Sequence, residues 1–107
     1  MLQAPETSVD PNVLRLGAGK AVSALKVLAN EDRLLLLCQL SQREMCVGEL
    51  EQMLDIRQPT LSQQLAVLRT QGVVATRRQG KNVFYRVADR DLLEILAVLY
   101  RLYCPEE

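Results

Sequence analysis

Histidine is absent from this chain of 107 residues. Without an imidazole the chain cannot form Ser-His-Asp or Cys-His catalytic groups, and it has no histidine to act as a general acid or base. Zinc sites that include a histidine ligand are excluded for the same reason. We therefore expect a protein that is not an enzyme, with no catalytic residue, no cofactor and no bound metal.

Long apolar segments are missing as well. Unbroken apolar runs such as Leu34–Cys38 are far shorter than the roughly 20 residues that span a bilayer. The first residues have neither the basic region nor the apolar core of a signal peptide. These features predict a cytoplasmic protein that has no membrane partner.

Acidic residues are absent from one long segment, although the formal net charge of the chain is zero. Residues 57–86 hold six basic side chains and no acidic one, whereas the rest of the chain holds seven basic and thirteen acidic residues. The six basic residues are Arg57, Arg69, Arg77, Arg78, Lys81 and Arg86. A basic segment between acidic flanks is expected of a protein that presents one face to the phosphates of a nucleic acid.

Hydrophobic periodicity predicts a mainly α-helical domain with a small β-hairpin at residues 11–107, after a flexible tail at residues 1–10. Asp10-Pro11 and Asn30 are typical helix starts, and Gly72 is a typical helix stop. The predicted helices cover residues 11–29, 31–40, 45–54, 59–71 and 89–103.

The second and last helices differ in their apolar pattern. In the second helix, Leu34, Leu37 and Cys38 are spaced to share one buried face. The last helix is apolar around almost its whole circumference and must be covered on more than one side. In so short a chain, one cover is the protein's own core and the other is a second copy of the protein. The sequence therefore predicts a homodimer.

The fourth helix and the segment after it carry the candidate contacts to double-stranded DNA. Two β-rich runs, 73–78 and 83–87, flank a hairpin turn signal at 79–82. Two short helices followed by a basic hairpin form the winged helix-turn-helix arrangement. Gln, Ser and Thr side chains suit base edges, while Arg and Lys hold the DNA backbone. The candidate DNA-binding residues are Gln58, Thr60, Ser62, Gln63, Gln64, Arg69, Arg77, Arg78 and Lys81.

Five ordered segments carry a family resemblance. They are LANEDRL at 28–34, VGEL at 47–50, QPTLSQQLAVLR at 58–69, GVVATRR at 72–78 and VFYRV at 83–87. Over about residues 13–104 the chain resembles the ArsR/SmtB family of bacterial repressors. Within it, the chain is most similar to the BigR, SqrR and HlyU branch of dithiol regulators. The resemblance implies a dimer joined by the first and last helices that binds an imperfect inverted repeat.

Three cysteines are an odd number, and a reducing compartment makes structural disulfides unfavourable. Cys38 lies on the apolar face of the second helix and Cys104 at the end of the last, so the two can approach if these helices pack together. A buried cysteine is often only a small core residue, which remains an alternative for Cys38. The resemblance implies a redox pair at Cys38 and Cys104, bridged by reactive sulfur or oxidants with a loss of DNA affinity.

Two further alternatives concern the same thiols. Metal-sensing members of the family carry Cys-Val-Cys at the start of the third helix, where this chain has Cys46-Val47-Gly48 and hence only half of the site. Cys38, Cys46 and Cys104 together would suit a soft metal or metalloid ion. A thiol oxidoreductase is disfavoured because the chain has no Cys-x-x-Cys motif.

Overall fold

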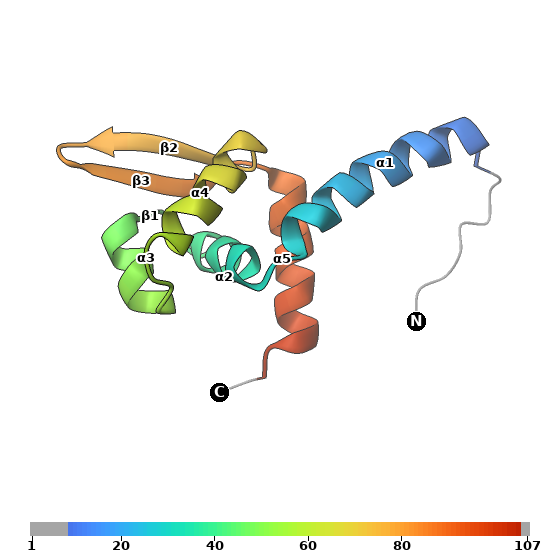
Figure 1. The fold of residues 1–107 in the computed structure, drawn as a ribbon. Coiled ribbons are helices and arrows are strands. Elements are labelled where there is room, and N and C mark those ends of the chain that lie inside the picture. The colour runs from blue at the N-terminus through green and yellow to red at the C-terminus, as the bar shows by residue number, and fades with distance from the viewer. Residues whose placement is uncertain (1–8, 106–107) are drawn as a thin grey trace.

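The computed structural model describes residues 9–105, which form five helices and a three-stranded sheet (Figure 1). Most of the predicted tail, residues 1–8, lies outside the described residues. The elements in chain order are α1 (Pro11–Leu28), α2 (Glu31–Leu40), β1 (Met45–Cys46), α3 (Val47–Leu54), α4 (Thr60–Thr70), β2 (Val74–Gln79), β3 (Asn82–Val87) and α5 (Arg90–Tyr103).

The predicted helix ends are confirmed by their capping contacts. Side-chain oxygens of Asp10, Asn30 and Asp89 each accept a backbone N–H from the first turn of α1, α2 and α5, at 2.8–3.1 Å. These contacts satisfy donors that have no partner within a helix. Gly72 follows α4 with a φ of 74°, a left-handed conformation that glycine adopts without strain.

The sheet is antiparallel in the order β1-β3-β2, so the predicted hairpin gains a third strand. Met45 pairs with Tyr85 and Cys46 with Phe84. The prediction that Met45 and Cys46 begin the third helix is therefore wrong. Their extended backbone is held by β3, and Met45 is 1% exposed, so pairing and burial outweigh the helical pattern of this short segment.

The hydrophobic core surrounds α2, which packs against α1, α3, α4, β3 and α5. Its residues Leu36, Leu37 and Leu40 are at most 3% exposed. The predicted buried face of α2 is thus only partly right, because Leu34 and Cys38 are half-buried. Neighbours lie on several sides of α2, so helical spacing alone does not show which apolar residues reach the centre.

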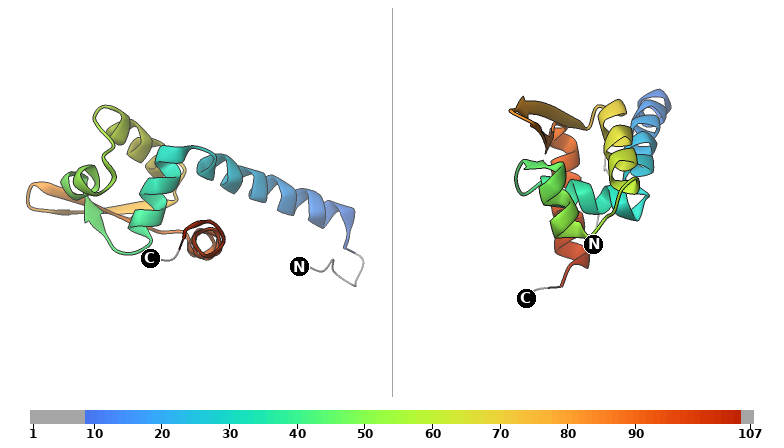
Figure 2. Two further views of the ribbon diagram at one scale, coloured as in Figure 1. Left: turned by 90° about the horizontal axis from the view of Figure 1, so that it is seen from below. Right: turned by 60° about the vertical axis from the view of Figure 1, so that its left-hand side comes forward.

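Two helices leave apolar side chains uncovered. α1 projects from the body of the molecule and buries only Val27 and Leu28, while α5 buries Leu92 and Leu96 (Figures 1 and 2). No helix within residues 9–105 is both long and apolar enough to cross a membrane. The exposed apolar residues of both helices, here called the α1/α5 apolar surface, are Val13, Leu14, Leu16, Val22, Leu25, Ile95, Val98, Tyr100, Leu102 and Tyr103.

The cap at the start of α2 gives a first test. Asn30→Ala removes the acceptor of the Arg33 backbone N–H. Loss of such a cap costs about 1 kcal/mol, which lowers the melting temperature of a domain of this size by roughly 4–8 °C. Asn30→Asp retains an acceptor oxygen and serves as the matched control. Thermal unfolding followed by circular dichroism measures the effect, and a melting temperature of Asn30→Ala equal to that of the wild type would contradict the assigned role.

Candidate nucleic-acid interface and cysteine pair

The two short helices α3 and α4 are joined by a tight connection. α3 ends at Leu54 and is followed by Asp55, whose φ of 54° is left-handed and turns the chain toward α4. The three leucines of α4 are buried, so the opposite side of the helix faces solvent. The predicted contact residues that lie exposed on this side are Ser62, Gln63 and Arg69. Side chains of this kind on one helix face are available to a partner.

Other predicted contacts near α4 have partners inside the protein. Gln58 Oε1 accepts the backbone N–H of Ser62 at 3.0 Å and thereby caps the start of α4. Gln64 is half-buried, and its Oε1 accepts a hydrogen bond from Arg33 Nη1 at 3.1 Å. Thr60 is half-buried at the first position of α4. The sequence pattern showed these residues to be polar but did not reveal these internal contacts.

The hairpin of β2 and β3 extends in the direction opposite to α1 (Figure 1). Its strands are joined by Gly80-Lys81, with Gly80 at a φ of 61°. Arg78 and Lys81 are exposed, and within residues 9–105 their side chains form no hydrogen bond or ion pair. The end of the hairpin therefore presents two cations to solvent.

Arg77, the third predicted cation of the hairpin, is exposed but has partners within the protein. Its Nε and Nη2 donate to Glu44 Oε1 at 2.7 and 2.6 Å, and its Nη1 donates to Gln79 Oε1 at 2.8 Å. The guanidinium lies 4.7 Å from the ring centre of Phe84. Hydrogen bonding to Glu44 is the main cause that raises the pKa of Arg77. Because Glu44 lies outside the acid-free segment, the charge pattern along the chain did not reveal this partner.

Arg33 is a further residue that sequence reasoning missed. Its Nε donates to the Val27 carbonyl at 2.8 Å, its Nη2 to the Lys26 carbonyl at 2.9 Å and its Nη1 to Gln64. One side chain thus joins the end of α1, the start of α2 and the middle of α4. No local signal predicts a contact between residues that lie 31 positions apart.

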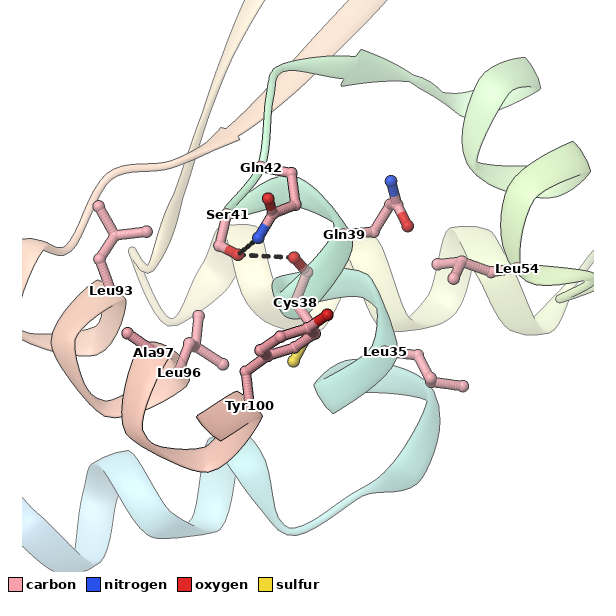
Figure 3. A pocket seen from close by; sticks show the side chains of 10 residues that line it. All are labelled: Leu35, Cys38, Gln39, Ser41, Gln42, Leu54, Leu93, Leu96, Ala97 and Tyr100. Carbon is pink, nitrogen blue, oxygen red and sulfur yellow. Dashed lines mark hydrogen bonds between the residues drawn. The ribbon is translucent and has the colours of Figure 1, made fainter. Parts of the chain in front are cut away.

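Cys38 lies in the wall of a cavity of about 730 Å³ between α2 and α5. The other lining residues include Leu35, Leu54, Leu96 and Tyr100, and Figure 3 shows the sulfur of Cys38 beside the Tyr100 ring. Burial is the main cause that raises the pKa of the Cys38 thiol, and the neighbouring Cys104 raises it further. A protonated, half-buried thiol is a weak nucleophile at neutral pH.

Cys104 is exposed at the end of α5, where its backbone N–H donates to the Tyr100 carbonyl at 3.0 Å. Tyr100, which lines the same cavity as Cys38, lies one turn before Cys104, so the packing of α5 against α2 places the end of α5 on the side of α2 that carries Cys38. The predicted packing of the last helix on the second is confirmed, while the pairing of Cys38 with Cys104 stays a prediction.

Cys46 lies apart from this pair, on β1 opposite Phe84. Its backbone N–H donates to the Glu49 carboxylate at 3.1 Å, and this contact is the main cause that lowers the pKa of Glu49. Within residues 9–105 no three or more Cys, Asp or Glu side chains are grouped to hold a metal ion. A three-thiolate site of Cys38, Cys46 and Cys104 is thus not formed within one protomer.

Known proteins match both the sequence and the fold. A family model described as "Bacterial regulatory protein, arsR family" matches residues 30–76. The "Biofilm growth-associated repressor" of Agrobacterium fabrum is 56% identical over 84 residues, which are 78% of this chain and 72% of that protein. The "Transcriptional activator HlyU" of Vibrio cholerae is 45% identical over 87 residues, which are 81% of each protein. The chain belongs to the ArsR family.

The structure of the transcriptional repressor BigR from Xylella fastidiosa aligns with this ArsR protein with a TM-score of 0.84 at 41% identity. The alignment covers 92% of this chain and 100% of BigR. These matches confirm the predicted winged helix-turn-helix fold and the predicted likeness to BigR and HlyU. This ArsR protein is thus a DNA-binding transcriptional regulator, in which α3 and α4 form the helix-turn-helix and the β2/β3 hairpin is the wing.

Proposed function

We propose that this ArsR protein is a cytoplasmic, non-enzymatic repressor that binds an inverted-repeat operator as a homodimer and releases it when Cys38 and Cys104 are bridged. The observation that carries the proposal is the packing of α5 against α2, which puts Cys38 in one cavity with Tyr100, four residues before Cys104. Cys104 also contributes to the raised pKa of Cys38, after the larger effect of burial. Reactive sulfur or oxidant species are the inducers, and no cofactor is required. The likeness to BigR, which is named a transcriptional repressor, supports the sign of regulation.

The DNA surface consists of the solvent side of α4 and the end of the wing. Ser62 and Gln63 are exposed on α4 and read base edges, while Arg69, Arg78 and Lys81 hold the phosphate backbone. Six basic residues and no acidic one in segment 57–86 support this assignment. Thr60 and Gln58 lie at the start of α4, where recognition helices approach the groove.

The α1/α5 apolar surface supports the homodimer. Ile95, Val98 and Leu102 follow one another at helical spacing on the solvent side of α5, and each is at least 37% exposed. An apolar surface of this kind is stabilised by burial against a second copy. A two-fold axis through it places two α4 helices in successive major grooves, about 34–36 Å apart, and requires an operator with inverted symmetry.

Bridging requires an oxidant, and a hydropersulfide supplies it. The exposed Cys104 thiolate attacks the terminal sulfur of R–S–S–H, which forms Cys104–S–SH and releases R–S⁻. The Cys38 thiolate then attacks the Cys104 sulfur, which forms the disulfide and releases HS⁻. The two thiolates lose two electrons, and the sulfane sulfur is reduced to sulfide. If further hydropersulfide transfers sulfur to the thiols before the disulfide forms, the bridge between Cys38 and Cys104 contains more than two sulfur atoms.

A bridge between Cys38 and Cys104 acts on DNA binding because it joins α2 to the end of α5. The end of α5 carries part of the α1/α5 apolar surface, including Leu102 and Tyr103. Drawing this end toward α2 changes the dimer contact and hence the spacing of the two α4 helices. The bridge lowers DNA affinity by the difference between the free energy of forming it in the DNA-bound dimer and in the free dimer.

The DNA surface is tested by substitutions on the wing and on α4. Lys81→Ala or Arg78→Ala should weaken binding to all DNA sequences. Each should also reduce the slope of log affinity against log salt concentration by about one for each wing, because one phosphate contact is lost there. Gln63→Ala should instead relax base preference at one position of each half-site, at roughly 1–3 kcal/mol. Lys20→Ala, which removes a charge from α1, is the control. Fluorescence anisotropy at several salt concentrations measures these effects, and unchanged binding by all three variants would refute the assignment.

The dimer is tested at Val98, which lies between Ile95 and Leu102 on the exposed apolar side of α5. Val98→Glu places a charge in the proposed interface, and we expect a monomer at micromolar concentration with operator binding weakened at least tenfold. Val98→Ile retains the apolar surface and should remain dimeric. Analytical ultracentrifugation measures the mass of each variant. A wild-type monomer that binds the operator tightly at the same concentration would contradict the proposal.

The cysteine pair is tested by operator binding after treatment with polysulfide. Wild type and Cys46→Ser should release DNA, whereas Cys38→Ser and Cys104→Ser should remain bound. Because the pKa of Cys38 is raised, its thiolate fraction grows as the pH rises toward that pKa, so wild-type bridging should be faster at pH 9 than at pH 7. Alkylation followed by intact mass gives the rate. Release of DNA by treated Cys104→Ser would show that the pair is not the sensor.

A further inference from the structure

Arg33 occupies the junction of α1, α2 and α4. It lies in the first turn of α2, and its guanidinium donates to the carbonyls of Lys26 and Val27. Both carbonyls belong to the last turn of α1, where no helical N–H can reach them. A cation at this end also interacts favourably with the helix dipole. The position of Arg33 is therefore fixed by two contacts to the backbone.

The remaining guanidinium nitrogen of Arg33 reaches α4 and fixes the orientation of an amide. Nη1 donates to Gln64 Oε1 at 3.1 Å. Because a guanidinium has only donors, the Gln64 atom that faces it must be the oxygen. The amide NH₂ of Gln64 consequently points away from Arg33, and within residues 9–105 it has no acceptor. The oxygen of the half-buried Gln64 is turned toward Arg33, which occupies one of its two lone pairs, so the groups that Gln64 offers a partner on its other side are its N–H groups.

We infer that Arg33 is a positioning residue for DNA recognition, which turns the oxygen of Gln64 inward so that its N–H groups face the base edges. The inference rests on the operator binding proposed above and names the chemistry of one contact. A glutamine that reads adenine uses its oxygen and its NH₂ together, and guanine instead presents two acceptors, N7 and O6. Held by Arg33, Gln64 selects guanine. Gln63 is exposed and has both amide atoms available for adenine.

The same contact ties base reading to the position of α1. Arg33 holds the last turn of α1 and the amide of Gln64 with one planar group, so a displacement of α1 alters the direction in which Gln64 points. α1 also carries half of the α1/α5 apolar surface. Arg33 consequently connects the proposed dimer contact with the proposed DNA contact.

The test is selection of binding sites from a library of duplexes with a randomised 30-base-pair centre, carried out with the full chain. Wild type is compared with Gln64→Met, Arg33→Lys and the matched neighbour Gln63→Met. Gln64→Met should abolish base preference at one position of each half-site, at which the wild type prefers guanine over adenine about tenfold. Arg33→Lys retains the charge but lacks the planar guanidinium with its several donors. The amide of Gln64 is then free to rotate, so the base preference at that same position should shift toward adenine. Gln63→Met should alter a different position.

Three results would overturn the inference. The first is a wild-type preference for adenine at the position that Gln64→Met abolishes. The second is a uniform loss of affinity in Gln64→Met without any change in base preference. The third is an Arg33→Lys variant that binds more weakly but selects the same bases, since a purely structural arginine would do this. Gln64→Met leaves the contacts of Arg33 to α1 in place, so the first two results do not depend on the stability of Arg33→Lys. If the wild type enriches no motif, the proposed operator binding itself has failed, and the inference falls with it.

Discussion

Burial of α2 on several sides is the constraint on which the other features of this ArsR protein depend. Leu36, Leu37 and Leu40 hold it against α1, α3, α4, β3 and α5. Arg33 near its start reaches α1 and α4, while Cys38 near its end lies beside α5. Because its central leucines are buried in the core, α2 links its two ends through one continuous helix. A contact made at Cys38 and a contact made at Arg33 thus act on the same helix.

Local signals in the sequence predicted most of the fold. Asp10, Asn30 and Gly72 mark helix ends by their own backbone chemistry, and the turn around Gly80 has a conformation that glycine favours. The strand at Met45 and Cys46 was missed because two residues carry no periodic pattern. It exists only through pairing with β3, about 40 positions later in the chain.

The candidate site was predictable in its composition but not in its internal contacts. Exposed Gln63, Arg78 and Lys81 lie where the helix and hairpin patterns place them. Arg77 belongs to the same basic segment, yet Glu44, Gln79 and Phe84 hold it against the sheet. Charge counted along the chain does not show which cations are paired across strands, since that depends on strand order. The position of Cys38 beside Tyr100 likewise depends on how α5 packs against α2.

In the proposed mechanism, one intrachain bridge separates the DNA-bound form from the released form. The most direct measurement is to treat the operator complex with a limiting amount of polysulfide, separate bound from released protein, block free thiols and map the cysteine peptides of each fraction by mass spectrometry. We expect a Cys38–Cys104 cross-link within one chain in the released fraction and alkylated Cys38 and Cys104 in the bound fraction. An equal share of this cross-link in both fractions would contradict this mechanism.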